Sequence, residues 1–157
     1  MKQSVQFSDA IHIMVYVACT NNPDFLKSEM IASSIRTNAS NVRKIMGNLR
    51  RAGLIISQRG KAQPRLAKDI SDITLLDIFA SLPVEKTLLQ VDKNTNANCI
   101  IGGSIQEVLT ARYQEIQEAA EKVMASITLS DIMADFSQIV VQRHPDFTEE
   151  VRRFLPD

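Results

Sequence analysis

Residues 28–55 read SEMIASSIRTNASNVRKIMGNLRRAGLI, and this stretch decides how the rest of the chain is understood. Its apolar spacing predicts a short helix over Glu29–Ile35 and a second helix over about Ser40–Ala52. Between them, Arg36–Asn38 forms a turn of three or four residues. Two helices joined by so short a turn are typical of a helix-turn-helix.

The second helix has a buried stripe and a polar outer face. Val42, Ile45, Met46 and Leu49 follow the i, i+3, i+4, i+7 pattern of a packed face. The other faces carry arginine, lysine and asparagine. Arginine and lysine neutralise phosphates, and arginine and asparagine can also make paired hydrogen bonds to guanine and adenine. The helix is therefore predicted to recognise DNA.

A basic hairpin is expected directly after this helix. Leu54–Ile56 and Arg65–Ala67 are β-prone runs, and the turn-rich residues 59–64 lie between them. A basic hairpin that follows a recognition helix is the wing of a winged helix, and its expected role is to touch the DNA backbone or minor groove.

Charge is divided unevenly along the chain, although the net charge is zero. Lys27–Lys68 contains ten basic residues and one acidic residue, Glu29, so it carries +9 and the remainder −9. Such a segment attracts a polyanion, while an acidic remainder discourages non-specific association. A merely solvated basic face is the alternative explanation of the charge alone.

Residues of this segment are the candidate DNA contacts. Those around the turn and the start of the second helix should enter the major groove, and the later basic residues should contact phosphates and the wing's groove. The full set is Ser28, Thr37, Asn38, Ser40, Asn41, Arg43, Lys44, Arg50, Arg51, Arg59, Lys61 and Arg65.

Several helix ends carry recognisable capping residues. Ser8 and Ser28 are suited to be N-caps of a first helix ending near Cys19 and of the short helix. Gly53 is suited to end the second helix. The hexapeptide Ile73–Ile78 is echoed at Ile127–Ile132, and both have a threonine and an aspartate at capping-box spacing, so two helix starts are predicted.

A long helix is predicted over Ser104–Ser126, after the interruption Gly102–Gly103. It would exceed what one small domain needs to cover, so pairing with a second subunit is expected. A helix of the chain's own core is the alternative. The expected dimerisation residues are Ile105, Leu109, Ile116 and Val123.

The resulting organisation has four parts. Residues 1–84 form the winged helix-turn-helix domain, 85–103 a linker loop, 104–127 the dimerisation helix and 128–157 a C-terminal helix and tail. The fold class is mainly α with a small β-hairpin wing.

Arg36–Asn38, Val42–Ile45, Leu49–Ile55 and Ile73–Ile78 together resemble the Rrf2 family, the bacterial regulators that include IscR, NsrR and CymR. The resemblance covers the first helix through the long helix. It implies a homodimeric winged-helix repressor that reads a palindromic operator with paired recognition helices. Two features depart from many members: the wing is shorter and lacks an aromatic residue before its second strand.

Cysteine content places the chain in a cysteine-poor branch similar to the YwnA type. Iron–sulfur members hold three closely spaced cysteines before the long helix, where this chain has Cys99 alone. A cluster normally needs three or four protein ligands, so no cluster, metal or other cofactor is expected. Cys99 is a candidate redox-sensing thiol, with a small packed residue at a helix start as the alternative.

Composition agrees with a soluble, cytoplasmic protein without a membrane partner. Hydrophobic residues make up 45% of the 157, the two cysteines form no disulfide framework, and the apolar run Ile11–Cys19 is too short to span a bilayer. No catalytic motif stands out, so no enzyme is expected. The predicted function is a DNA-binding transcriptional repressor with an unknown effector; the alternative is a dimeric protein-interaction or small-molecule-sensing module without DNA binding.

Overall fold

A computed structural model describes residues 2–20, 22–57, 63–83 and 87–155, with the side chains of residues 2–4 left aside. It is mainly helical, with one small hairpin. The helices are α1 (Lys2–Cys19), α2 (Ser28–Ile35), α3 (Ala39–Arg51), α4 (Leu75–Ser81), α5 (Ile100–Ser126), α6 (Leu129–Arg143) and α7 (Thr148–Val151). Short 3-10 turns are η1 (Ile70–Asp72), η2 (Pro145–Phe147) and η3 (Arg152–Phe154). The predicted fold class is confirmed.

The hairpin consists of β1 (Ile55–Ile56) and β2 (Arg65–Leu66). The strands are antiparallel, with Ile55 opposite Leu66 and Ile56 opposite Arg65. Ile55 is buried and Ile56 exposed, as alternation along a strand with one solvent face requires. The tip at residues 58–62 lies outside the described residues.

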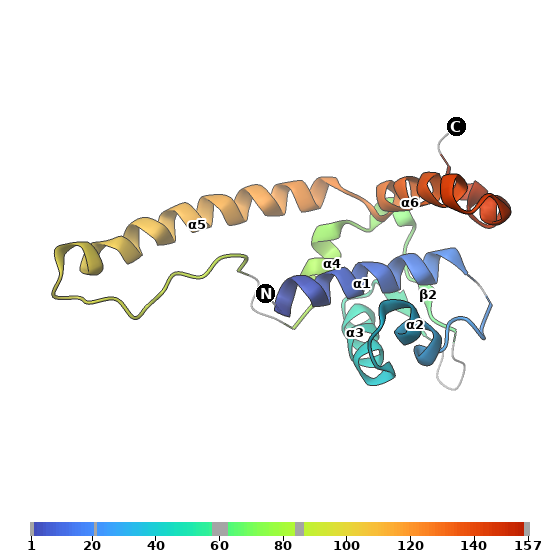
Figure 1. The fold of residues 1–157 in the computed structure, drawn as a ribbon, viewed down its shortest axis with the longest axis horizontal. Coiled ribbons are helices and arrows are strands. Elements are labelled where there is room, and N and C mark those ends of the chain that lie inside the picture. Colours follow the sequence, from blue (N-terminus) through green and yellow to red (C-terminus); the bar gives the residue numbers. More distant parts are fainter. Residues whose placement is uncertain (1, 21, 58–62, 84–86, 156–157) are drawn as a thin grey trace.

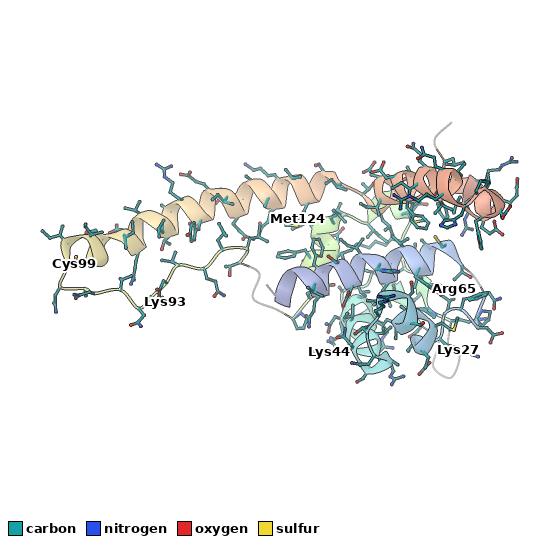
Figure 2. All side chains as sticks on the ribbon, in the orientation of Figure 1. Lys27, Lys44, Arg65, Lys93, Cys99 and Met124 are labelled. Carbon is teal, nitrogen blue, oxygen red and sulfur yellow. The ribbon has the colours of Figure 1, made fainter. Side chains whose placement is uncertain are left out.

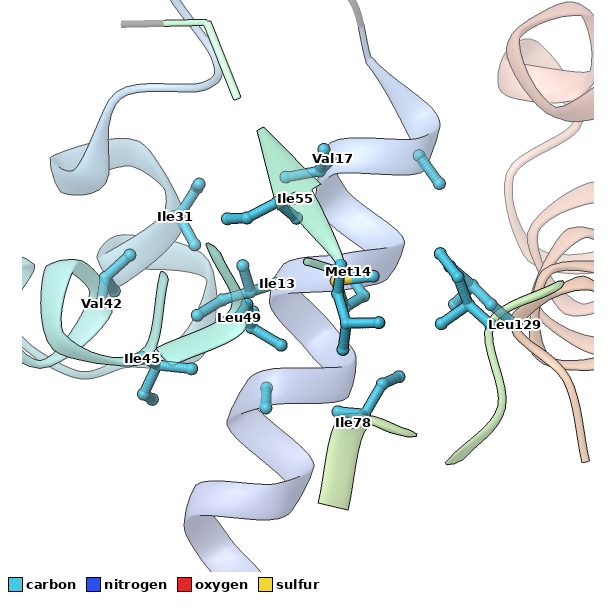
Figure 3. Close-up of a cluster of buried hydrophobic side chains, with 14 of the residues drawn as sticks. Ile13, Met14, Val17, Ile31, Val42, Ile45, Leu49, Ile55, Ile78 and Leu129 are labelled. Carbon is cyan, nitrogen blue, oxygen red and sulfur yellow. The ribbon is translucent and has the colours of Figure 1, made fainter. Parts of the chain in front are cut away.

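Helix α1 lies at the centre of the body, with α2 and α3 on one side and α6 on the other (Figure 1). Its Ile13 and Met14 are fully buried, and Figure 3 shows them between Leu49 of α3 and Leu129 of α6. Helix α6 therefore completes the same core as the helix-turn-helix, although 128–157 was expected as a separate part.

The two echoed hexapeptides meet in space. Thr74 and Thr128 form an isolated antiparallel bridge, with Leu75 N–H donating to Ile127 O at 2.9 Å and Leu129 N–H to Ile73 O at 2.7 Å. Both threonines make the predicted capping box with Asp77 and Asp131. The repeated motif thus starts α4 and α6 side by side.

Two predicted N-caps are wrong. Helix α1 begins at Lys2 instead of after Ser8, and its earlier turns place Phe7 edge-on to Phe79 of α4, with ring centroids 5.4 Å apart. This contact stabilises the first turns of α1, where the sequence itself gives only a weak helix pattern. Ser28 is the first helical residue of α2, and Lys27 occupies the cap position without a side-chain bond.

Helix α5 begins at Ile100, four residues before the predicted start, so Gly102–Gly103 lies inside the helix. The glycines serve a close approach: a Cβ at Gly102 would stand 2.5 Å from Asn96 O, and one at Gly103 would stand 2.9 Å from Ala97 O. Thr95 strengthens this packing by donating its hydroxyl to Gly102 O at 2.6 Å. The preceding loop thus lies directly on the first turn.

Candidate nucleic-acid interface

The turn between α2 and α3 fixes how the second helix is presented. Arg36 ends α2 in the left-handed conformation, with φ of 60°, and Thr37 N–H donates to Ala32 O at 3.0 Å. Asn38 then caps α3 by accepting from Asn41 N–H at 2.8 Å. These bonds satisfy backbone groups that both helix ends leave open, so the angle between the helices is set locally.

Apolar contacts hold the other side of α3. Val42, Ile45 and Leu49 are buried against α1 and α2, as predicted (Figure 3). Gly53, with φ of 71°, ends the helix, and Leu54 N–H donates to Leu49 O at 3.0 Å. This is the glycine-terminated end that the sequence indicates. With one side fixed in the core, the opposite side of α3 faces solvent.

The exposed side of α3 presents Ser40, Arg43 and Lys44 together. Figure 2 shows Lys44 at the outer edge of the body, away from α1 and α6. Arg43 Nη1 lies 3.1 Å from Glu29 Oε1 of α2, in an ion pair that leaves both side chains more than half exposed. The Glu29 backbone N–H and the Arg43 guanidinium hold the pKa of the Glu29 carboxyl below its usual range.

The asparagines near the turn have structural partners. Asn38 Oδ1 is used by the cap, while Asn41 Nδ2 donates to Thr37 Oγ1 at 3.2 Å and to Asp9 Oδ2 at 3.5 Å. Thr37 and Asn41 are half-buried. Base contacts by these side chains, which the sequence predicts, would require exchange of these bonds.

The basic residues at the end of α3 form hydrogen bonds with neighbouring side chains. Arg50 Nη1 donates to Ser57 Oγ at 3.0 Å at the base of the hairpin, and Arg51 Nη2 donates to Asn48 Oδ1. Asn48 itself is buried, although the asparagines of this helix were expected on its outer faces. Both arginines remain exposed, so their charges are available to phosphates.

The remaining candidates are dispersed. Ser28 is half-buried in the first turn of α2. Arg65 is exposed and lines a hollow with Val17 and Arg153, so it lies beside the end of α1 rather than beside Lys44. Arg59 and Lys61 lie outside the described residues.

Arg36 joins the candidates on structural grounds. It is exposed in the turn itself, one residue before Thr37, where a cation can meet the backbone of DNA that enters beside α3. Its charge was counted in the basic segment, but the helical pattern gave no reason to select it. A positive φ at a non-glycine residue stores strain, which is typical of functional turns.

Cys99, the candidate thiol, precedes α5 as its N-cap and is exposed. The backbone N–H groups of Gly102 and Ile101 hold the pKa of this thiol below its usual range. Figure 2 shows Cys99 at the far end of α5 from Lys44. Cys19 behaves oppositely, because burial raises its pKa against the opposing effect of Arg153.

A family model matches residues 3–135, that of Rrf2, described as an iron-dependent transcriptional regulator. The chain belongs to the Rrf2 family. It is 33% identical over 124 residues to YwnA of Bacillus subtilis, named as an HTH-type transcriptional regulator, with 79% of this chain and 91% of YwnA covered. This Rrf2 protein is accordingly a transcriptional regulator and not an enzyme.

Solved structures agree with this fold. One described as a DNA-binding protein is 31% identical, covers 82% of this chain and 98% of its own, and has a TM-score of 0.63. CymR, the global cysteine regulator of B. subtilis, is 23% identical, covers 81% and 91%, and has a TM-score of 0.57. The latter likeness bears on the fold alone.

Iron in the family description raises the question of a metal site. Cys99 is one thiol where a cluster needs three or four ligands, and Cys19 lies at the end of α1. The described part of the chain has no group of three or more His, Cys, Asp or Glu side chains placed to hold a metal ion. The residues present therefore do not fit a cluster.

None of the described helices has the length and apolar character to cross a membrane.

Proposed function

We propose that this regulator binds a palindromic operator as a homodimer and represses transcription. The observation that carries the proposal is the exposed basic side of α3, whose opposite side is fixed in the core. In this arrangement Ser40, Arg43 and Lys44 enter the major groove. Arg50 and Arg51 neutralise phosphates beside it. Arg59 and Lys61, which come between β1 and β2 in the sequence, are expected to do the same. A protein that acts on bacterial DNA works in the cytoplasm.

Helix α5 supports the homodimer. None of its 27 residues, all of which the structure describes, is buried, and it extends away from the body (Figure 1). Val108, Ile116 and Val123 are each about half exposed. Ile105 and Leu109 add to the same stripe and are half-buried. A helix about 40 Å long, at about 1.5 Å per residue, gains most from pairing with its mate, since apolar surface then leaves water.

Two arginines can separate base reading from phosphate binding. We expect Arg43→Ala to relax the preference for one sequence over another, because a guanidinium near the start of a recognition helix can pair with a base edge. Arg50→Ala should weaken all DNA alike and reduce the salt slope by about 1. Affinity is measured by fluorescence anisotropy on a selected genomic fragment and on a scrambled one, at several salt concentrations.

Lys93→Ala is the matched control, because Lys93 carries the same charge but lies beside α5, far from Lys44 (Figure 2). It should leave both affinities unchanged. If Arg43→Ala lowers the affinity for both fragments to the same extent, as Arg50→Ala is expected to do, the division of roles is wrong. If the protein binds neither fragment even at low salt, an interaction module without DNA binding is the better reading.

The dimer has its own test. Ile116→Asp places a charge in the apolar stripe and should convert the dimer to monomer in sedimentation velocity, whereas Gln114→Asp should not. Gln114 is exposed on the opposite side of α5, at roughly 100° per residue. Equal sedimentation of the two variants as dimers would show that α5 is not the interface.

A further inference from the structure

An apolar hollow lies between the end of α1, the turn before α2 and the helices α6 and α7. Its volume is about 750 Å³, within the range of small-molecule sites. Tyr16, Phe136 and Val140 form much of its wall. Residues from three distant parts of the chain thus surround one space, at the end of the body away from the free end of α5 (Figure 1).

Exposed hydrophobic side chains gather at this hollow. Phe25, Ile139 and Phe147 are 48%, 48% and 56% exposed, and all three line it. Single exposed apolar residues are ordinary, but three that converge from separate segments mark a binding surface. Cys19 adds to the apolar wall, because burial raises the pKa of its thiol and keeps it neutral.

The polar groups at the rim favour an anion. Arg143 and His144 stand together at the end of α6, and Glu150 of α7 is the acid among the lining residues. Among the described residues, no side chain forms an ion pair or hydrogen bond with the Arg143 guanidinium. Arg152, by contrast, is paired with Glu149 at 3.2 Å. Arg143 is therefore the cation free to hold a ligand's acid group.

We propose that this hollow binds a small apolar or aromatic molecule that carries one anionic group. The apolar body fills the space between Phe25, Phe136 and Phe147, and the acid group meets Arg143. Arginine is suited to this role because its planar guanidinium binds a carboxylate or sulfonate through two hydrogen bonds.

The position of the hollow gives it a regulatory use, and this part rests on the proposed function. Phe25 belongs to the turn that leads into α2, while α6 follows α5 in the chain. A bound molecule therefore touches both the turn that leads into the helix-turn-helix and the element joined to the dimerisation helix. A ligand with different affinity for two arrangements of these elements shifts their populations.

The site itself is tested without DNA. Anilinonaphthalene sulfonate, an aromatic anion, is titrated into the full chain and followed by fluorescence, with phenylnaphthylamine as the uncharged counterpart. Ile139→Asp places a carboxylate in the apolar wall and should raise the sulfonate Kd by at least about tenfold, because the wall becomes polar and repels the sulfonate. Gln138→Asp places the same side chain on an exposed neighbouring position outside the lining and should change the Kd less than about twofold.

The anionic group is tested by charge removal. Arg143→Ala should weaken the sulfonate about tenfold, as expected for loss of a charge-assisted hydrogen bond, and leave the uncharged dye nearly unchanged. Arg152→Ala, with the same loss of charge nearby, should affect neither dye. Equal weakening of both dyes by Arg143→Ala would overturn the assignment of the anion.

Other outcomes also contradict the proposal. Sulfonate binding that Ile139→Asp leaves intact would place the dye elsewhere, such as on the stripe of α5. Binding that disappears as the protein dimerises would mean that a second copy covers the hollow. Saturating sulfonate should change the affinity for DNA at least about threefold if the site is regulatory. Dye binding without that change would show that the hollow binds a ligand but does not regulate DNA binding.

Discussion

Helices α1 and α5 are both long and both carry an apolar stripe, yet their surroundings are opposite. Among its described side chains, helix α1 has five that are buried, those of Ala10, Ile13, Met14, Val17 and Ala18. Helix α5 is longer by half and none of its described residues is buried. The first is enclosed by α2, α3, α4 and α6, while α5 has its main contact with α4.

The contrast shows what an apolar pattern can and cannot establish. Periodicity indicates that one side of a helix will leave water. It does not say whether that side packs on its own chain or on another copy. In α1 the capping motifs at Thr74 and Thr128 bring α4 and α6 alongside, so the stripe is covered within the chain. Helix α5 meets α4 and the loop that precedes it, but neither of them buries any of its residues, and the proposed dimer would cover its stripe.

The largest expected difference concerns equivalent truncations in the two helices. Ile13→Ala should lower the free energy of unfolding by about 2–5 kcal/mol, because it leaves a cavity in a closed core. Ile116→Ala should leave the unfolding of a monomeric background nearly unchanged, because Ile116 is 47% exposed. Urea denaturation of both variants measures this, at a protein concentration below the dimer dissociation constant, so that both are monomers. Similar losses in both would mean that α5 is packed within its own chain.

Glycine-to-alanine substitutions should change the free energy of unfolding in opposite directions in α5 and α3. Gly102→Ala should cost about 1–3 kcal/mol, because the new Cβ would overlap the Asn96 carbonyl and force the loop off the first turn. Gly47→Ala in α3 should instead stabilise by about 0.5–1 kcal/mol, since its Cβ would meet the flexible end of Arg51 at 3.8 Å. Denaturation midpoints decide the sign in each case. A stabilising Gly102→Ala would show that the loop does not lie on the helix.

The capping threonines at the starts of α4 and α6 have a smaller expected effect. Thr128→Ala removes the hydroxyl that accepts from Asp131 N–H at 3.2 Å and should cost about 1 kcal/mol. Thr74→Ala, in the twin motif, should cost a similar amount through the 3.1 Å bond from Asp77 N–H. Thermal unfolding tests both. Thr148→Ala, whose hydroxyl bonds to Pro145 O outside a cap, is the comparison and should cost less.

The cysteines of the two helices should differ in reactivity. Cys99 receives backbone N–H groups that lower the pKa of its thiol, so its thiolate forms at lower pH than in a free cysteine. Cys19 is partly buried, its pKa is raised, and it should react at higher pH. Iodoacetamide labelling across a pH series, followed by peptide mass spectrometry, gives the order. Faster labelling of Cys19 would contradict the described surroundings of both thiols.

Local signals in the sequence were sufficient for part of this fold. The turn at Arg36–Asn38, the end of α3 at Gly53 and the capping boxes at Thr74 and Thr128 depend on residues within a few positions of one another, and all are confirmed. Contacts between distant residues could not be anticipated. The early start of α1 depends on Phe7 meeting Phe79, far along the chain. The early start of α5 is local, and it was missed because Gly102–Gly103 was interpreted as an interruption, whereas these glycines allow the close approach of the Asn96 and Ala97 carbonyls.

The candidate interface shows the same division. The basic residues of α3 could be selected by helical phase, and Arg43 and Lys44 are exposed as expected. Arg65 lies beside α1 because strand pairing, rather than local pattern, places it there. Arg36 could not be selected from the sequence, because only its charge, and no helical pattern, pointed to it. The apolar hollow was not foreseen, because Phe25, Phe136 and Phe147 are too far apart in sequence to suggest a common site.

The stoichiometry of the complex with DNA tests the central claim most directly, because it requires both the basic side of α3 and the stripe of α5. Sedimentation of the protein with a labelled, genome-selected fragment should show two protomers per duplex, and Ile116→Asp should abolish this species. One protomer per duplex, bound as tightly by Ile116→Asp as by the unaltered protein, would contradict the account.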